Sequence, residues 1–144
     1  MSAMNGMNIS ASGMTAQRLR MDIISQNIAN VNTTRDENGN PYKRKAVIFA
    51  EKDMTPFGEV LMKTAGNVGS GVKVTKIVED NKAMRKVYDP SHPDADEEGY
   101  VTYPNVNIVQ EMTDLIDATR SYEANVTAFN ATKNMALKGL EVGK

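Results

Sequence analysis

The chain has 144 residues, of which 40% are hydrophobic and 24% are charged, and it contains no cysteine. Its net charge of −1 and pI near 5.8 give no basic field that would attract nucleic acid or anionic lipid. Without cysteine, disulfides and thiolate metal sites are excluded. No 18-residue apolar run and no cleavable secretory leader is visible, so we expect one soluble domain with a modest core.

Apolar residues between residues 8 and 31 recur with the spacing of a helix. One stripe repeats largely every seven residues, and a second set lies two positions away, which at about 100° per residue is nearly the opposite side. The first stripe contains Met7, Met14, Met21, Ile24, Ile28 and Val31, and the second contains Ile9, Ala16, Leu19 and Ile23. This pattern predicts an N-terminal helix with two apolar faces.

The middle of the chain has the composition of short strands separated by glycine and proline turns. Alternating or Val/Tyr-rich runs occupy residues 42–51, 71–80, 85–90 and 99–104. All five prolines lie in the connections around these runs or at their ends. We therefore expect four short strands.

A second helical pattern runs from residue 107 to about residue 138. Its apolar stripe keeps a 4-3 spacing and contains Ile108, Met112, Leu115, Thr119, Tyr122, Val126, Phe129, Lys133, Ala136 and Leu140. Asn107 is a candidate N-cap and Gly139 a candidate stop. A set of mostly small residues lies roughly opposite and would permit close helix approach: Ala124, Ala128, Ala131 and Met135.

These patterns predict an α+β fold in which the two terminal helices pair as a coiled coil. The helices would be about 36 Å and 48 Å long, more than a compact body of this size needs. We expect residues 1–34 and 107–144 to form a terminal helical domain. Residues 35–106 would then form a β-rich middle domain.

Local patterns that imitate catalytic or binding motifs each fail on spacing. The glycine-rich run at residues 66–74 lacks the Lys-Ser/Thr of a phosphate loop, and residues 94–99 begin like a calcium loop but have Asn105 where a bidentate Glu is required. His92 lies in a proline-flanked loop, and "YKRK" at residues 42–45 reads as a solvated edge strand. We therefore expect no catalytic residue, metal, cofactor, small-molecule substrate or nucleic-acid partner.

The helices remain as the strongest signal, because each has more apolar circumference than one partner covers. One stripe can seal the helix pair, and an exposed second stripe marks an interaction surface. A contact between unlike patches on successive subunits would extend into a rod or tube. The predicted assembly faces comprise Met14, Met21, Ile24, Ile28, Ile108, Met112, Leu115, Tyr122, Val126 and Phe129.

Three other interpretations stay open on the pattern alone. A globular core could wrap around both helices, or the chain could be a soluble coiled-coil adaptor or scaffold built on one helical hairpin. An enzyme with a hidden carboxylate site at Asp94, Asp96 and Glu98 is the third.

The run "NIANVNTT" resembles the N-terminal signature of the flagellar axial family of rod and hook proteins. Its motif residues are Asn27, Ile28, Ala29, Asn30, Asn32 and Thr33. The segments "NGNPYKRKAVIF", "GVKVTKI", "VYDPSHPDADEEGYVTYPNVN" and "SYEANVTAFNATK" are similar, in order and spacing, to the short proximal-rod members of that family. The resemblance covers essentially the whole chain, and the loop at residues 53–71, which is long for the family, is the one departure from it.

The resemblance implies a structural subunit of the rod, the drive shaft that crosses the periplasm within the flagellar basal body. It implies export by the flagellar type III apparatus without a cleaved signal peptide, and helices that pack in an inner tube. The implied partners are further copies, other rod proteins and the adapter between the rod and the membrane ring. Phe57 and Leu61 resemble the Phe-x-x-x-hydrophobic element that engages the export gate, although an apolar loop anchor would look the same.

Asparagine also has a physical reason to occur where the first helix ends. Its short side chain bonds nearby backbone groups and tolerates left-handed geometry. We expect Asn27, Asn30 and Asn32 to end the helix and turn the chain toward the strands.

Overall fold

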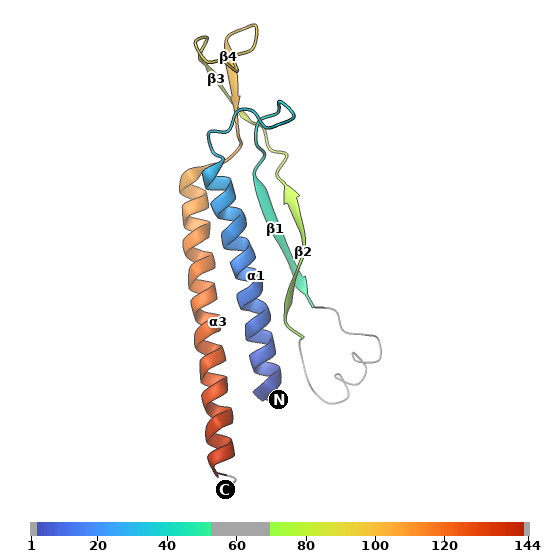
Figure 1. The fold of residues 1–144 in the computed structure, drawn as a ribbon, viewed down its shortest axis with the longest axis vertical. Helices are drawn as coiled ribbons and strands as arrows, with labels where there is room; N and C mark the ends of the chain where they lie inside the picture. The colour runs from blue at the N-terminus through green and yellow to red at the C-terminus, as the bar shows by residue number, and fades with distance from the viewer. Residues whose placement is uncertain (1–2, 53–69, 143–144) are drawn as a thin grey trace.

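The computed structural model describes residues 3–52 and 70–142, and this part of the chain is elongated (Figure 1). The elements follow in the order α1 (Ala3–Ala29), β1 (Lys45–Glu51), β2 (Val72–Glu79), β3 (Arg85–Tyr88), β4 (Tyr100–Tyr103) and α3 (Ile108–Val142). The α+β class and the four strands predicted from the sequence are confirmed. Neither helix of the described residues is apolar enough along its length to cross a membrane.

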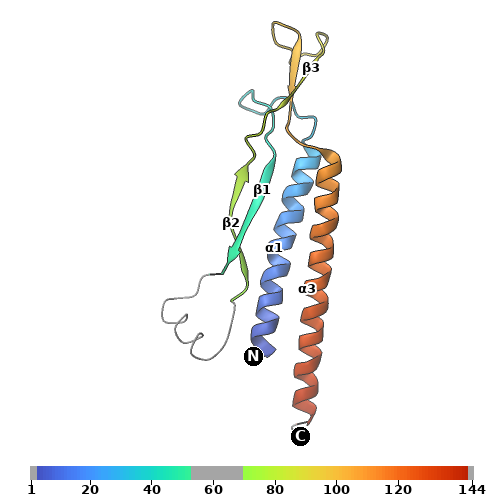
Figure 2. The same cartoon turned by 180° about the vertical axis from the view of Figure 1, so that it is seen from behind.

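Helices α1 and α3 run antiparallel, side by side, in both views (Figures 1 and 2). A Cβ atom at Gly6 would contact Thr132, and one at Gly13 would contact Asn125. Further along the same seam, Asn27 is hydrogen-bonded to Glu111. These contacts advance by seven or fourteen residues on both helices, which is the heptad register of a coiled coil.

The seam on α3 is rotated by one position from the predicted stripe. The inward positions are held by Glu111 and Ala118, both fully buried, whereas Met112 is 54% exposed. The other half of the predicted stripe is placed correctly. Its members Leu115, Tyr122 and Phe129 are half-buried. Polar and small side chains can occupy the seam because glycines on α1 let the two backbones approach closely.

The stripe of small residues on α3 is also not where close packing occurs. All four of its members are exposed: Ala124, Ala128, Ala131 and Met135. Close approach of a helix to this stripe would have to come from another subunit, and it stays a prediction. Within the subunit, Gly6 and Gly13 of α1 have that role.

Strands β1 and β2 form an antiparallel pair that runs along α1, on the side away from α3 (Figures 1 and 2). Ala16 and Ile23, from the second apolar stripe of α1, are buried, and Ile9 and Leu19 are half-buried. The second face of α1 is therefore largely covered by the subunit's own strands. The expectation that this face must find a neighbour, lipid or solvent is wrong for α1.

Strands β3 and β4 form a second antiparallel hairpin that projects beyond the ends of the helices (Figure 1). Val101 on β4 is fully buried, and Gly99, with φ of +80°, turns the chain into that strand. The chain termini lie toward the opposite end of the molecule.

One predicted helix boundary is confirmed, and two differ from the predictions. Asn107 caps α3 as expected, since its side-chain oxygen accepts the backbone N–H of Val109 at 3.0 Å. However, α3 continues through Gly139 to its last residue, Val142. At the other junction, Asn27 lies inside α1, and no described residue except glycine has a positive φ, so the expected left-handed asparagine is absent there.

Candidate functional site

Asn27 is fully buried in the last turns of α1, and every hydrogen-bonding position of its amide is used. Its Nδ2 donates to the carbonyl oxygen of Lys45 at 2.8 Å and to Oε2 of Glu111 at 2.9 Å. Its Oδ1 accepts the hydroxyl of Tyr42 and the backbone N–H of Lys45, both at 2.9 Å. One side chain thereby joins α1, the start of β1 and α3.

Glu111 is a fully buried carboxylate, and such a group is tolerated only when its oxygens are paired. Oε2 accepts from Asn27, and Oε1 accepts the Nε–H of Arg44 at 2.6 Å. Arg44 was expected on a solvated edge strand, and this expectation is wrong. Its guanidinium supplies the charge that allows Glu111 to be buried.

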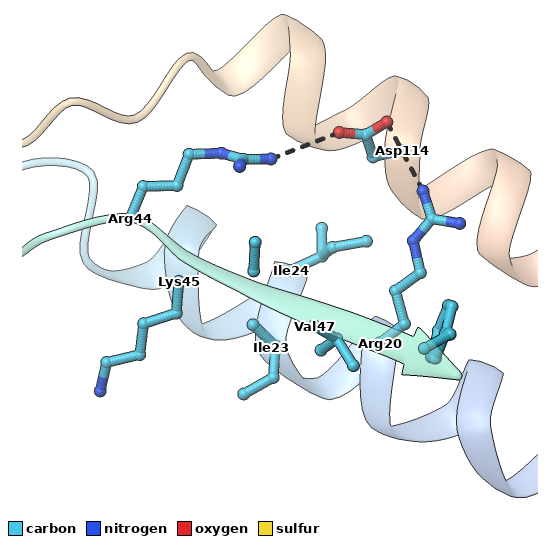
Figure 3. A pocket seen from close by; sticks show the side chains of 9 residues that line it. Arg20, Ile23, Ile24, Arg44, Lys45, Val47 and Asp114 are labelled. Carbon is cyan, nitrogen blue, oxygen red and sulfur yellow. Dashed lines mark ion pairs between the residues drawn. The ribbon is translucent and has the colours of Figure 1, made fainter. Parts of the chain in front are cut away.

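Arg44 also extends the network toward α1 and β2. Asp114 lies between two arginines, 3.5 Å from Nη2 of Arg44 and 3.8 Å from Nη2 of Arg20 (Figure 3). Nη1 of Arg44 lies 3.9 Å from Asp80. These three longer contacts are partly exposed to solvent, so they contribute less than the buried Arg44–Glu111 pair.

Asn105 closes the network on the side of the strands. Its Oδ1 accepts the backbone N–H of Arg44 at 2.9 Å, and its Nδ2 donates to the carbonyl oxygens of Asp80 at 2.8 Å and Lys82 at 3.2 Å. The segments that enter β1, leave β2 and lead to α3 therefore meet at one place. We call Asn27, Tyr42, Arg44, Asn105 and Glu111 the polar junction.

The polar junction also changes the acidity of one member. Burial raises the pKa of Tyr42 above its ordinary value, and the negative charges of Glu111 and Glu79 act in the same direction. The neutral hydroxyl is therefore the form that the fold prefers, and it is the form that can donate to Asn27.

Most of this network is not predicted from the sequence. The sequence predicts Asn27 as a family-motif residue that ends the helix, and it does not predict Arg44, Asn105 or Glu111 as site residues. One feature of the sequence does point to the network. Glu111 lies seven residues before Ala118, so the two residues occupy the same heptad position on α3, and one of them is charged. A heptad position filled by a charge needs a partner, which is the clue to a junction.

A hollow of about 240 Å³ lies beside the polar junction, between α1, β1 and α3. Its lining combines apolar side chains, among them Ile23, Ile24 and Val47, with the charged side chains of Arg20, Arg44, Lys45 and Asp114 (Figure 3). Its one carboxylate, Asp114, is already paired. Within residues 3–52 and 70–142 no group of three or more acidic or histidine side chains could hold a metal ion.

The acidic loop at residues 94–99 is held by contacts with residues 34 and 35 and by hydrogen bonds within its own turn. Asp94 lies 2.8 Å from Arg35 and accepts the hydroxyl of Thr34 at 2.7 Å. Asp96 accepts the backbone N–H groups of Glu98 and Tyr100. These two carboxylates hold the loop in shape.

Helix α3 leaves apolar side chains exposed near both of its ends. Those near its start are Ile108, Val109, Met112 and Ile116, which we call the open face, and those near its end are Met135, Leu137 and Leu140. Of the predicted assembly residues, Ile108 and Met112 belong to the open face, whereas Met14, Met21, Ile28 and Val126 are half-buried and Ile24 is buried within the subunit. The proposed export element, Phe57 and Leu61, lies outside the described residues.

Comparisons with known proteins match both ends of the chain to rod families. Residues 7–35 match the family described as "Flagella basal body rod protein", and residues 97–142 match "Flagellar basal body rod FlgEFG protein C-terminal". The first segment contains the Asn27–Thr34 motif, and the second contains β4 and all of α3.

Relatives match over the full length. The "Flagellar basal-body rod protein FlgC" of Bacillus subtilis is 52% identical, with all of both chains covered. The protein of that name from Borreliella burgdorferi is 44% identical over 99% of this chain and 98% of its own, and that from Salmonella typhimurium is 36% identical over the whole of both. The chain therefore belongs to the FlgC family of flagellar basal-body rod proteins and is a structural subunit of the proximal rod.

Proposed function

We propose that the chain is a non-enzymatic subunit that assembles into the proximal rod through the open face of α3 and transmits torque along the shaft. The observation that carries this proposal is the exposure of large apolar side chains on a helix whose other side packs against α1. Val109 is 75% exposed, Met112 54% and Ile116 53%. Contiguous apolar surface of this kind is characteristic of a protein interface.

The shape of the helices supports a role in carrying load. Helix α3 is continuous over 35 residues, about 52 Å at 1.5 Å per residue. The seam with α1 and the polar junction tie it to the rest of the subunit. A lateral contact through the open face can therefore pass force into the whole molecule.

We further propose the partners and the route. The chain would contact further copies of itself, other rod proteins and the adapter between the rod and the membrane ring. It would be exported by the flagellar type III apparatus without a cleaved signal and act in the part of the basal body that crosses the periplasm. The family membership supports these steps.

The proposal is tested by placing charges on the open face. Met112→Asp and Ile116→Asp together should remove the subunit from purified basal bodies and abolish swimming, because two carboxylates would have to be desolvated at the interface. Arg18→Asp and Ser25→Asp form the matched control, since both residues are exposed on α1 and the pair also adds two carboxylates, away from the open face. Leu115 and Phe129 are less suitable because they are half-buried against α1.

Circular dichroism of the purified variants should show the same helix content as the wild type, because the altered residues are exposed. Normal incorporation and motility of the Met112/Ile116 variant would contradict the proposed use of this face.

A further inference from the structure

We propose that the β3–β4 hairpin of one subunit docks on the outer face of the β1–β2 pair of a second copy of this chain. The inference rests on the proposed function, since it names a second contact within the same assembly. The docking hairpin is called the tyrosine tip and comprises Tyr88, Asp96, Glu97, Glu98 and Tyr100. Its receptor is called the basic flank and comprises Ile48, Lys52 and Lys76.

The tyrosine tip presents an unpartnered aromatic face. Tyr88 and Tyr100 are opposite each other in the strand register, so they share one side of the hairpin. They are 64% and 40% exposed, and their ring centroids lie 5.3 Å apart at an interplanar angle of 67°. Exposed tyrosines held in a fixed arrangement are typical anchors of protein interfaces.

The tip is also strongly acidic. From Val87 to Tyr103 the sequence contains five Asp or Glu residues and no Lys or Arg. Asp94 is paired with Arg35, but Glu97 and Glu98 are exposed and are not among the ion pairs of the described residues. A partner surface for the tip must therefore be basic.

The tip is preformed, which lowers the entropy cost of docking. Asp96 holds the turn by accepting the N–H groups of Glu98 and Tyr100. Gly99 adopts φ of +80°, and a Cβ there would lie 3.0 Å from the ring of Tyr88. The glycine therefore lets the turn pack directly against the tyrosine.

The basic flank has the complementary properties. Residues 45–52 and 72–79 together contain four Lys and two Glu. Ile48 and Lys76 are opposite each other in the register and share a face, and both are exposed. Lys52 is four residues beyond Ile48, so the alternation of strand side chains places it on the same face, and it is exposed as well. The flank thus offers apolar contact for the tyrosines and positive charge for the acids.

The occupant is a second copy because the two surfaces belong to different parts of one elongated molecule. The tip projects past the helix ends, whereas the flank runs alongside α1 (Figures 1 and 2). A tip can reach a flank only on a neighbour displaced along the long axis. Such a contact joins unlike patches, so it extends from subunit to subunit instead of closing on itself.

The absence of cysteine in the natural chain makes a direct test simple. One chain carries Glu98→Cys and a second, differently tagged chain carries Lys76→Cys, and both are expressed in the same cells. Mild oxidation of purified basal bodies should give a mixed disulfide dimer of the two tagged chains. Neither chain alone should give a dimer, and neither should Lys76→Cys paired with Glu123→Cys, an exposed position on α3.

Charge reversal then tests the chemistry of the contact. Adding Glu97→Lys to the tip chain should lower the yield of mixed dimer roughly tenfold. Adding Lys52→Glu to the flank chain should restore much of it. The inference is overturned if the Glu98→Cys chain is present in basal bodies but forms no dimer with the Lys76→Cys chain, or cross-links only to a different rod protein.

These outcomes are separate from a failure of the proposed function. The proposed function is judged by whether the chain enters the rod and whether charges on the open face of α3 prevent it. The present inference is judged by which side chains meet once the chain is there.

Discussion

At the scale of single residues, Asn27 shows why one amide can hold three elements together. An asparagine side chain offers two N–H donors and two acceptor positions, and here all four are used. The donors meet a carbonyl and a carboxylate, while the acceptor meets a hydroxyl and a backbone N–H. Neither aspartate nor leucine can reproduce this combination at the same volume.

We predict that Asn27→Asp destabilises the chain by about 3 kcal/mol, because it removes both donors and places a second carboxylate against buried Glu111. The measurement is the free energy of unfolding in urea. Asn32→Ala is the control, since Asn32 is exposed, and it should change stability by less than about 0.5 kcal/mol. Equal stabilities of the Asn27 variant and the wild type would show that the polar junction is not a stabilising unit.

Tyr42 predicts a specific dependence on pH. Because its pKa is raised in the folded chain, its contribution to stability is complete below the ordinary tyrosine pKa of about 10 and is lost as the pH rises through the raised value. The stability difference between the wild type and Tyr42→Phe should therefore shrink at alkaline pH. The ordinary tyrosine pKa of about 10 lies between about pH 8 and about pH 11. A stability difference between the wild type and Tyr42→Phe that stays constant over this range would contradict a raised Tyr42 pKa.

At the scale of elements, the pairing of α1 with α3 depends on how closely the backbones approach. A Cβ at Gly13 would lie 2.7 Å from Oδ1 of Asn125 and 3.0 Å from its Cγ. The Asn125 side chain is held in place, since its Nδ2 donates to the carbonyl oxygen of Ser121 at 2.8 Å. Glycine at this position is therefore a requirement of the seam.

We predict that Gly13→Ala lowers the melting temperature although alanine is the better helix former, with a net loss of about 1 kcal/mol. Asn125→Ala in the same chain should relieve the clash and recover stability. Gly139→Ala is the control, because nothing lies within 4 Å of a Cβ there, and it should stabilise the helix by up to about 1 kcal/mol. A Gly13→Ala protein that gains as much stability as Gly139→Ala would refute the close approach.

The element scale also shows where a sequence pattern misleads. Apolar periodicity found both helices and half of the seam on α3, including Leu115, Tyr122 and Phe129. It then selected Met112 for the other half because that residue is apolar, whereas the fold uses Glu111 and Ala118. Periodicity cannot recognise a buried charge whose partner, Arg44, is 67 residues away along the chain.

At the scale of the whole molecule, the described residues form a long, thin body with little buried core. The fully or nearly buried apolar side chains among them are Ala16, Ile23, Ile24, Val101 and Ala118. A subunit of this kind has lateral surface available along most of its length. This is the property that a rod requires.

We predict that small-angle X-ray scattering of the monomer in dilute solution gives a radius of gyration well above the value of about 15 Å expected for a compact chain of this length. The physical reason is the continuous length of α3, which alone is about 52 Å. A radius near the compact value would mean that the helices fold back into a globule.

The sequence by itself determined the two terminal helices, the four strands between them and the family resemblance, because these depend on local periodicity, turn residues and short motifs. Only the tertiary structure decided which faces remain open. It covered the second face of α1 with β1 and β2, turned Met112 and Ile116 outward, and gathered Asn27, Arg44 and Glu111 into one junction. Those outcomes depend on contacts between residues far apart in the chain, where close backbone approach and the pairing of a buried charge outweigh the apolar pattern.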